Sequence, residues 1–190
     1  MSDVITINTE NNSWQTFPQQ DFICSGKGLG ELSRKFMDPK MLEIGCDVGD
    51  TAEFMLRSHP MLHLTSIDPY ENYIDWNGNN LNERESVYTK FMDRLKGYSN
   101  RFGLLRGYSD DVVGKVLDNF FDVVFIDGLH TYDQLSKDCV NYYPLLKDGG
   151  IFSGHDFTAI EGVNRAAKEF AATVNKEIMT TECDVWYWYK

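Results

Sequence analysis

The amino-acid sequence predicts an α/β fold built on a doubly wound sheet of seven strands, five parallel strands followed by a terminal antiparallel hairpin. The chain has 190 residues, of which 42% are hydrophobic, so it can form one domain with a well-packed core. Short apolar segments alternate with segments of helical periodicity from residue 41 onward. Little more than Glu182-Cys183 separates the last two apolar segments, a spacing that fits a hairpin and leaves no room for a crossover helix.

The N-terminal region precedes this alternation. Residues 1–20 are polar and predict an irregular arm. They have neither the basic start nor the apolar run of a secretory signal peptide, so we expect a cytoplasmic protein. Apolar residues at helical spacing predict a short helix over 30–37, and Asp38-Pro39 ends it because the residue before a proline disfavours the helical conformation.

Strands and helices then follow one another along the chain. The segment 121–126 is the strongest strand, because only Asp122 breaks its apolar run, as expected for a strand covered on both faces. Asp50-Thr51 caps a helix that Pro60 prevents from extending past about residue 58. The expected strands are 41–44, 62–67, 102–106, 121–126, 151–153, 176–180 and 184–190. The expected helices are 50–58, 83–96, one from Ser109 that carries Val112 to Leu117, 131–143 and 162–174, with a polar stretch around Asn77–Asn80 and a turn at 147–150.

The net charge restricts the partners of the protein. Lys and Arg number 18 and Asp and Glu number 29, which gives a net charge of −11, and no basic stripe relieves it. Nucleic acid phosphates and anionic membrane surfaces would be repelled, so we expect neither as a partner. No stretch approaches the roughly 20 apolar residues that span a bilayer. The four cysteines lie far apart and form no CxxC pair, which argues against a zinc knuckle or a disulfide framework.

Polar residues concentrate where the expected parallel strands end. The first strand runs into a loop from Glu43 to Asp50 with the pattern E-x-G-x-x-x-G, and this loop opens a helix. Glycine lets the backbone approach a ligand closely, and a helix N-terminus offers unpaired N–H groups. The alternative is a tight turn that needs glycine only for packing. The loop is not a G-x-G-x-x-G dinucleotide fingerprint, because Asp47 stands where the second glycine should be.

The second and third strands also end in polar side chains. Asp68 lies some twenty residues after the loop, where an acidic side chain accepts hydrogen bonds from ribose hydroxyls. The alternative is an Asp that caps a helix before Pro69. After the third strand, Ser109 and Asp110 either cap the following helix or hydrogen-bond an adenine amino group, and both roles are compatible.

The fourth and fifth strands end in acids and imidazoles. Asp127 and His130 follow the fourth strand, and His155-Asp156 follows the fifth. Parallel sheets bind ligands beyond their carboxyl ends, so these side chains should gather at the functional edge. Ionisable groups beside a buried sheet cost stability unless they are used or paired, which favours a functional cluster.

In this order, these segments resemble those of a class I S-adenosylmethionine-dependent methyltransferase. The resemblance rests on the loop 43–49, on Asp68, on Phe125-Ile126-Asp127-Gly128-x-His130-x-Tyr132 and on Lys147-Asp148-Gly149-Gly150-Ile151-x-x-Gly154-His155-Asp156. The last two segments, with Gly162-Val163-x-x-Ala166, are particularly similar to the small-molecule O-methyltransferase branch that includes macrolide-sugar methyltransferases. The resemblance covers roughly residues 40–190 and implies a Rossmann-like fold whose seventh strand is antiparallel. It divides the chain into an N-terminal arm with a short helix, 1–38, and a single methyltransferase catalytic domain, 39–190.

The resemblance implies which residues bind S-adenosylmethionine. The glycines would pass under its methionine half, and Glu43 would orient the loop or reach the ammonium group through water. Asp68 would hold the ribose, and Ser109-Asp110 would face the adenine. An acidic lining also suits a sulfonium cation. The implied cofactor-binding residues are Glu43, Gly45, Gly49, Asp68, Ser109, Asp110 and Asp127.

The implied chemistry is an in-line displacement in which a hydroxyl acceptor loses a proton. His130 is the expected base, because the ordinary pKa of histidine lies near neutrality; the alternative is an imidazole that only ties its loop. Asp127 and Asp156 would hold a divalent metal, Mg²⁺ or Mn²⁺, that lowers the pKa of a hydroxyl. Metal-dependent relatives carry a second oxygen ligand beside the residue matching Asp156, whereas here His155 precedes it, and imidazole suits Mn²⁺ better than Mg²⁺. Without a metal, His130 and His155 would contact the acceptor directly.

The expected function is therefore transfer of a methyl group to a hydroxyl of a small molecule, with nitrogen acceptors left open. The segment 70–98 and the N-terminal arm would recognise the acceptor, with Tyr70, Tyr73 and Trp76 closing over it. The alternative is a cofactor-binding or scaffold protein that keeps the fold without turnover. The missing fingerprint disfavours a nicotinamide oxidoreductase, and the absence of an Asp/Asn-Pro-Pro-aromatic tetrapeptide disfavours DNA adenine methylation. A homo-oligomer stays open, since the strand 184–190 has an outward-facing ring available for a dimer contact.

Overall fold

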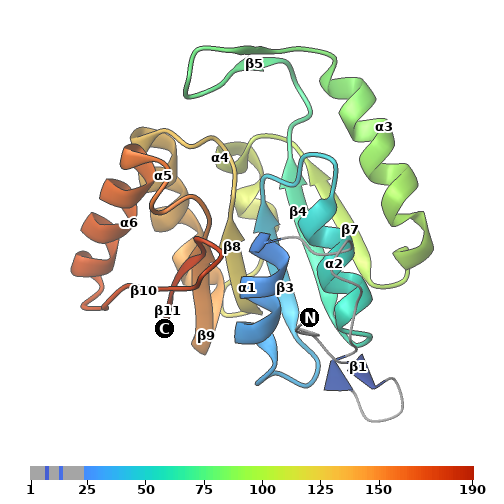
Figure 1. Ribbon diagram of the computed structural model, residues 1–190, viewed down its shortest axis with the longest axis horizontal. Helices are drawn as coiled ribbons and strands as arrows, with labels where there is room; N and C mark the ends of the chain where they lie inside the picture. The colour runs from blue at the N-terminus through green and yellow to red at the C-terminus, as the bar shows by residue number, and fades with distance from the viewer. Residues whose placement is uncertain (1–6, 9–12, 15–23) are drawn as a thin grey trace.

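Seven strands form the central sheet of the computed structural model, which describes residues 7–8, 13–14 and 24–190 (Figure 1). The order across the sheet is β10-β11-β9-β8-β3-β4-β7. Neighbouring strands from β9 to β7 are parallel, whereas β11 runs antiparallel to β9 and β10. The expected doubly wound, Rossmann-like sheet with a terminal hairpin is confirmed. The strands are β3 (Lys40–Ile44), β4 (His63–Asp68), β7 (Phe102–Arg106), β8 (Phe121–Ile126), β9 (Leu146–Gly154), β10 (Met179–Thr180) and β11 (Trp186–Tyr189).

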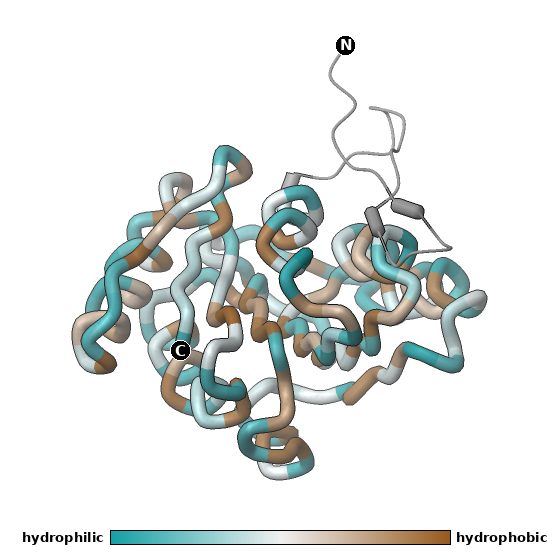
Figure 2. Tube along the Cα trace, turned by 90° about the horizontal axis from the view of Figure 1, so that it is seen from below, coloured by the Kyte–Doolittle hydropathy of each residue, from teal (hydrophilic) through white to brown (hydrophobic). Residues whose placement is uncertain are grey.

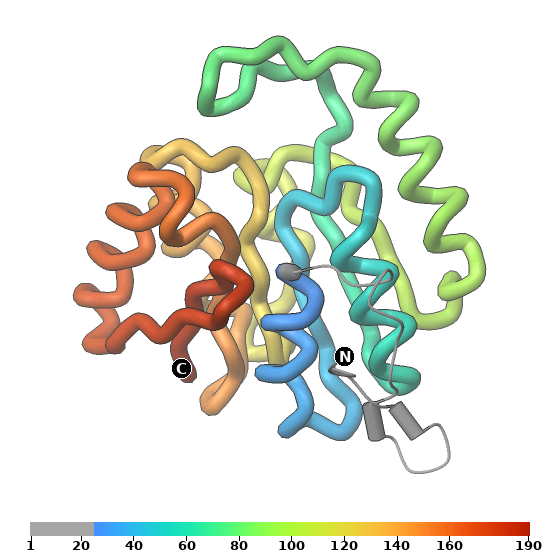
Figure 3. Tube along the Cα trace, viewed as in Figure 1, coloured from blue at the N-terminus to red at the C-terminus, as the bar shows by residue number. Residues whose placement is uncertain are grey.

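Helices cover both faces of this sheet (Figure 3). They are α1 (Cys24–Ser33), α2 (Asp50–Ser58), α3 (Arg84–Leu95), α4 (Ser109–Val112), α5 (Tyr132–Tyr142) and α6 (Glu161–Thr173). Val123 and Phe125 of β8 pack with α1, α2 and α3, while Val124 and Ile126 pack with α4, α5 and α6. All four side chains are buried, and hydrophobic residues gather along the central strands (Figure 2). The apolar run of β8 therefore marks a strand at the centre of the sheet, as predicted.

The first helix lies earlier in the chain than predicted. The expected helix over 30–37 is wrong in extent, because α1 spans Cys24–Ser33. Glycines at 26 and 28 weaken a helix by propensity, but here they permit close packing. A Cβ at Gly26 would lie 2.7 Å from Cδ1 of Phe54, and one at Gly28 would lie 2.8 Å from Oγ1 of Thr181. Tertiary contacts thus outweigh the local signal.

Two predictions in the second half are corrected as well. The expected turn at 147–150 is part of β9, which is longer than 151–153 and contains a register shift opposite β8. Gly149, with a φ of 76°, donates its N–H to the carbonyl of Lys190 at 3.1 Å, so pairing with the chain end holds this segment in the sheet. The helix from Ser109 ends at Val112 and continues only as a 3₁₀ turn, Val113–Lys115. Val112 is buried and Val113 and Val116 pack against the core, whereas Leu117 is exposed, so the apolar face ends before Leu117.

The polar stretch after β4 contains a small hairpin that the sequence pattern does not reveal. Strand β5 (Tyr73–Ile74) pairs with β6 (Asn80–Leu81). The carboxylate of Asp75 accepts hydrogen bonds from the backbone N–H groups of Asn77 and Asn79, at 2.9 and 2.8 Å, which closes the turn. In Figure 1 this hairpin extends across the top of the molecule, on the side of the sheet where β4 ends.

The two ends of the chain complete the fold. Strands β10 and β11 are shorter than the expected 176–180 and 184–190, and residues 181–185 connect them. The arm expected over 1–20 falls mostly outside the described residues; within it, β1 (Ile7–Asn8) pairs with β2 (Ser13–Trp14). In the part of the chain that the structure describes, no helix is long and apolar enough to cross a bilayer.

Candidate active site

The glycine loop after β3 lies directly against the end of β8. Gly45 and Gly49 have φ angles of 80° and 83°, a left-handed conformation that favours glycine. The N–H of Gly45 donates to the carbonyl of Ile67 at 2.8 Å, and a Cβ on Gly45 would collide with the carbonyl oxygen of Asp127. The loop is therefore held beside both neighbouring strand ends, and its glycines meet conformational and packing requirements of the chain itself.

Asp68, at the end of β4, organises this loop. Its Oδ2 accepts the backbone N–H groups of Cys46 and Asp47, each at 3.2 Å, and its Oδ1 accepts that of Tyr70 at 2.8 Å. Asp68 is 6% exposed. No helix follows it, since β5 comes next, so the helix-capping alternative is wrong. The carboxylate instead joins the end of β4 to the loop after β3.

Glu43 lies near the end of β3, just before the loop, and its side chain is fully buried. It is 1% exposed, and its Oε2 accepts a hydrogen bond from the Ser66 hydroxyl at 2.7 Å. Burial, together with the charges of Asp127 and Asp68, raises the pKa of Glu43 to about 8. Glu43 is therefore predominantly protonated at neutral pH and can donate as well as accept a hydrogen bond under the loop.

Two residues that sequence reasoning did not place here, Arg84 and Tyr70, complete the loop's surroundings. Arg84 Nη1 lies 2.5 Å from Oδ1 of Asp47, and Nη2 lies 3.8 Å from Oδ2 of Asp68. Tyr70 is 2% exposed, and its hydroxyl donates to the Asp47 carbonyl at 2.9 Å. Tyr70 is thus a support of the loop and not a ring that closes over an acceptor. Tyr73 and Trp76 are exposed on the hairpin, at 37% and 45%.

Ser109 and Asp110 face α5. Tyr108 precedes α4 without a side-chain cap, so Ser109 does not cap its helix. Its hydroxyl donates to Oδ1 of Asp138 at 2.6 Å, and Asp110 lies 3.5 Å from Nζ of Lys137. Burial raises the pKa of Asp138, which is 1% exposed, to about 6. The sequence signal for this contact was a carboxylate on the apolar face of α5, between Leu135 and Cys139.

The acids and imidazoles after β8 and β9 come together as predicted. Nε2 of His130 lies 3.1 Å from Oδ1 of Asp127 and 3.0 Å from Oδ2 of Asp156. Burial disfavours the charge on His130, but its hydrogen bonds to the two carboxylates prevail and raise its pKa to about 9. Hydrogen bonds from His130 and His155 hold the pKa of Asp156 well below its usual range. These three side chains are about three-quarters buried and form one ionic cluster.

His155 contacts the cluster from the side. Its Nδ1 lies 3.2 Å from Oδ1 of Asp156, and its Nε2 lies 3.0 Å from the carbonyl oxygen of Cys183. Both partners are acceptors, so the ring makes both hydrogen bonds only when both nitrogens carry protons. Burial opposes this charge, yet the hydrogen bond to Asp156 and the neighbouring carboxylates raise the pKa of His155. His155 therefore orients Asp156.

A comparison with protein families identifies the family to which this chain belongs. A family model described as a methyltransferase domain matches residues 42–157, which is more than half of the chain and includes the loop and the cluster. This chain belongs to that methyltransferase family. The class I S-adenosylmethionine-dependent methyltransferase expected from the sequence is thereby confirmed. Among curated proteins, none matches the sequence.

Solved structures share the fold of this methyltransferase. The O-methyltransferase NovP is 17% identical with a TM-score of 0.63, over 80% of this chain and 72% of NovP. The O-methyltransferase TomG from Streptomyces achromogenes, in complex with S-adenosylmethionine, is 14% identical with a TM-score of 0.60, over 87% and 79%. The methyltransferase PaMTH1 from Podospora anserina, bound to S-adenosylhomocysteine, is 15% identical with a TM-score of 0.61, over 92% and 82%. Identities this low establish the fold alone.

The acidic cluster of the methyltransferase has a donor set suited to a cation. Asp127, His130 and Asp156 each offer one ligand atom, and these atoms lie within 4.8 Å of one another. Two carboxylate oxygens and an imidazole nitrogen suit Mn²⁺ or Fe²⁺ better than Mg²⁺, which prefers oxygen. A cation bound there would replace the proton of His130. The predicted pair of Asp127 and Asp156 is thus accompanied by the imidazole nitrogen of His130.

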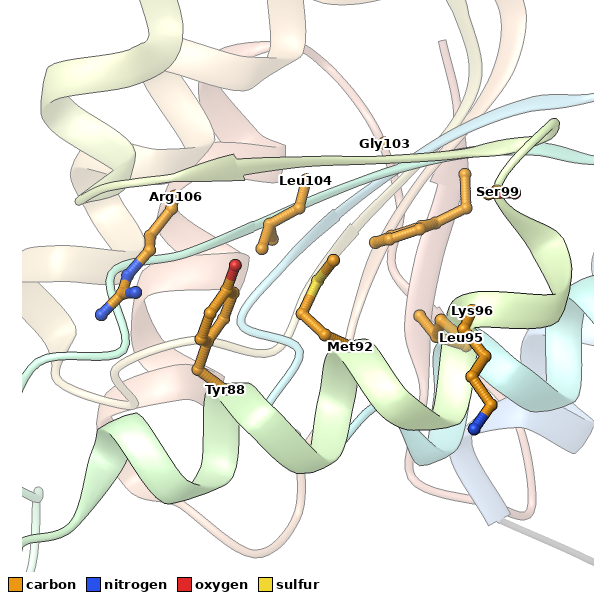
Figure 4. Close-up of a pocket in the computed structure, with 9 residues that line it drawn as sticks. Tyr88, Met92, Leu95, Lys96, Ser99, Gly103, Leu104 and Arg106 are labelled. Carbon is orange, nitrogen blue, oxygen red and sulfur yellow. The ribbon is translucent and has the colours of Figure 1, made fainter.

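Hollows elsewhere on the methyltransferase do not coincide with this cluster. One of about 320 Å³ lies between α3 and the edge strand β7, where Tyr88, Met92 and Leu104 line it (Figure 4). Another of about 340 Å³ lies on the far side of β7, against Val116 and Phe120. Neither contains a residue predicted for catalysis or cofactor binding, so the site is defined by its ionisable groups and its loop.

Proposed function

We propose that this methyltransferase transfers a methyl group from S-adenosylmethionine to a hydroxyl of a small molecule. The observation that supports this best is the contact between Gly45 and the backbone of Asp127, which sets the glycine loop beside the Asp127–His130–Asp156 cluster. A cofactor on the loop would present its methyl group to an acceptor that touches the cluster. The similar folds of NovP and TomG, both O-methyltransferases, favour an oxygen acceptor.

The cofactor would lie along the ends of β3, β4 and β7. The loop at Gly45 and Gly49 would carry its methionine half, above the protonated carboxyl of Glu43. Asp68 would accept hydrogen bonds from the ribose hydroxyls on lone pairs that its backbone contacts leave available. Ser109 and Asp110, at the start of α4, would border the adenine, where the exposed Asp110 would accept from the amino group while the Ser109 hydroxyl donates to Asp138. An acidic lining favours the sulfonium over the neutral product, S-adenosylhomocysteine.

The reaction needs an acceptor oxygen in line with the sulfur–methyl bond. The oxygen forms the new bond to the methyl carbon while the carbon–sulfur bond breaks, and its electron pair remains on sulfur. The hydroxyl proton passes to the neutral form of His130, which is the minority form at neutral pH because the pKa of His130 is about 9, and Asp127 and Asp156 stabilise the imidazolium that results. His155 holds Asp156 in place for this step.

Asp127, Asp156 and His130 would hold a divalent metal if the enzyme uses one. The metal would supply Lewis acidity, which lowers the pKa of a bound hydroxyl. In that case His130 serves as a ligand, and the two carboxylates remain the groups next to the acceptor.

Calorimetric titration with S-adenosylhomocysteine and, separately, with NAD⁺ tests the cofactor. We expect micromolar binding of the first ligand only, and about 10- to 100-fold weaker binding to Asp68→Asn, since hydrogen bonds to a charged group contribute about 1.5–3 kcal/mol. Asp122→Asn is the matched control, because this carboxylate pairs with Lys147 at the opposite end of β8 and should leave the affinity unchanged. Absence of binding to the wild-type protein would refute the proposal.

The competing hypothesis is a cofactor-binding or scaffold protein without turnover. Such a protein would also bind the cofactor through the loop and Asp68, but it would not need a general base. A screen of hydroxylated small molecules with labelled S-adenosylmethionine, with and without Mn²⁺, separates the two. Methyl transfer that His130→Gln abolishes, with cofactor affinity preserved, excludes the scaffold hypothesis.

A further inference from the structure

Arg84 is a charged residue in a place where a helix ordinarily disfavours one. It is the first residue of α3 and is only 7% exposed. The helix N-terminus carries a partial positive charge, so a buried cation there is unfavourable for α3 itself. Its Nε has no hydrogen-bond partner, which adds a desolvation penalty. The stability of α3 alone therefore does not account for arginine at this position.

The contacts of Arg84 reach two parts of the site at once. On one side the guanidinium binds Asp47 at 2.5 Å and lies 3.8 Å from Asp68. On the other side its Cζ lies 5.7 Å from the ring centre of Tyr73, and its backbone N–H donates to Oδ1 of Asn72 at 3.2 Å. Asp47 belongs to the glycine loop, whereas Asn72 and Tyr73 form the base of the β5–β6 hairpin.

Asp47 is held firmly enough to transmit a change in the loop. Its φ is 42°, a strained angle for a residue with a side chain. Its N–H donates to Asp68, its carbonyl accepts from the Tyr70 hydroxyl, and its carboxylate pairs with Arg84. A ligand that orders the backbone of this loop therefore also fixes the carboxylate that Arg84 binds.

We propose that Arg84 is a positioning residue that couples cofactor binding on the glycine loop to ordering of the β5–β6 hairpin. The inference rests on the proposed function, which gives the loop to S-adenosylmethionine, and on the expectation from the sequence that Tyr73 and Trp76 of the hairpin contact the acceptor. Cofactor binding to the loop restricts the motion of Asp47. The ion pair passes this restriction to Arg84, and the contacts of Arg84 with Asn72 and Tyr73 pass it to the base of the hairpin. The entropy of ordering the hairpin is then lost before the acceptor arrives, so cofactor and acceptor bind cooperatively.

Hydrogen exchange measured by mass spectrometry over residues 72–83 tests this coupling without a known acceptor. In the wild-type protein, saturating S-adenosylhomocysteine should slow exchange of the hairpin amides about fivefold or more, the lower end of ordinary coupling between sites. In Arg84→Met the hairpin should respond by less than about twofold, although the protein still binds the ligand at higher concentration. Arg84→Lys, which keeps the charge but cannot reach Asp47 and Asp68 together, should give an intermediate response.

Two further variants keep the test interpretable. Asp47→Asn removes the same ion pair from the loop side, and its side chain is 63% exposed, so the fold should tolerate it. Arg106→Met is the matched control, because Arg106 pairs with Glu85 of α3 and stacks on Tyr88 without reaching the loop. Asp47→Asn should lose the hairpin response, and Arg106→Met should keep it.

The failures of the two proposals can be told apart. If S-adenosylhomocysteine binds but the wild-type hairpin does not slow its exchange, the coupling is refuted and the proposed function stands. An Arg84→Met or Asp47→Asn hairpin that responds like the wild type likewise refutes the role of Arg84. Failure of the wild-type protein to bind S-adenosylhomocysteine would overturn the proposed function and the coupling with it.

Discussion

Nε2 of His130 lies 3.0 Å from Oδ2 of Asp156, which joins the loop after β8 to the loop after β9. The two are 26 positions apart in the chain, yet they share one ionic contact because their parallel strands end at the same edge of the sheet. Asp156 has a φ of 59°, an unusual angle for a residue with a side chain, and its carboxylate contacts both imidazoles. This contact forms the chemical centre of the proposed site.

Replacement of His130 by Gln should remove catalysis and leave cofactor binding intact. Glutamine preserves the size and a hydrogen bond to the carboxylates but cannot take up a proton. We expect kcat to fall by about 10²- to 10⁴-fold with an acceptor found in the screen. Calorimetric affinity for S-adenosylhomocysteine should stay within about twofold. A variant that retains most of the wild-type rate would show that His130 is only a structural imidazole.

Mn²⁺ should bind the metal-free protein at the acidic cluster. Binding is measured by the loss of the free Mn²⁺ signal in electron paramagnetic resonance. Asp156→Asn should weaken it by about tenfold or more, since it removes one of the carboxylate ligands. Asp122→Asn, at the opposite end of β8, should bind Mn²⁺ like the wild type. Equal Mn²⁺ affinity in the wild type and in Asp156→Asn would show that Mn²⁺ does not bind at this cluster.

Asp138 should make the stability of the protein depend on pH. Burial raises its pKa to about 6, above the ordinary value near 3.9, so the folded state holds this proton more tightly than the unfolded state does. Stability contributed by the neutral acid is therefore lost as the pH rises from about 4 to about 6. Two pKa units correspond to about 3 kcal/mol.

The variant Asp138→Asn tests this dependence by urea unfolding between pH 5 and 8. It should lose the decline between pH 5 and 6 and gain about 1–3 kcal/mol over the wild type at pH 7.5, less what is lost in hydrogen bonds to Ser109 and Gln134. Asp133→Asn, exposed on the same helix, should change the free energy of unfolding by less than about 0.5 kcal/mol. A parallel pH profile in Asp138→Asn and the wild type would contradict the assignment.

Alanine should not be tolerated at Gly45. The residue has a φ of 80°, and an added Cβ would collide with the carbonyl oxygen of Asp127. Strain and overpacking together should lower the free energy of unfolding by about 2–4 kcal/mol. Gly97→Ala is the control, because no heavy atom lies within 4 Å of its added Cβ and its backbone is not left-handed. Similar melting temperatures for the two variants would show that the loop can rearrange.

Most of the fold could be predicted from local pattern. The apolar runs of β8 and β7 each specify a strand within a few neighbouring positions, and both strands form where expected. Helix α2 also spans the expected residues, but the predicted cap at Asp50-Thr51 is wrong, because Gly49 is the N-cap and no side chain caps the helix. The errors fall where long-range contacts outweigh local preference. Gly26 and Gly28 look like helix breakers until Phe54 and Thr181 pack against them, and residues 147–150 look like a turn until the chain end pairs with them.

The candidate site was likewise predictable from the sequence only in part. Chain order alone places Asp68, Asp127 and Asp156 at strand ends, because a parallel sheet puts all its carboxyl ends on one side. Which side chains then touch depends on tertiary packing: His130 reaching both Asp127 and Asp156, Ser109 bonding to Asp138, and Arg84 crossing from α3 to Asp47. Sequence by itself thus determined the order of the strands along the chain and which polar and ionisable residues follow each strand. The partners of each charge were decided only by the folded structure, because hydrogen bonds act over about 3 Å and no local pattern records which distant segments come that close.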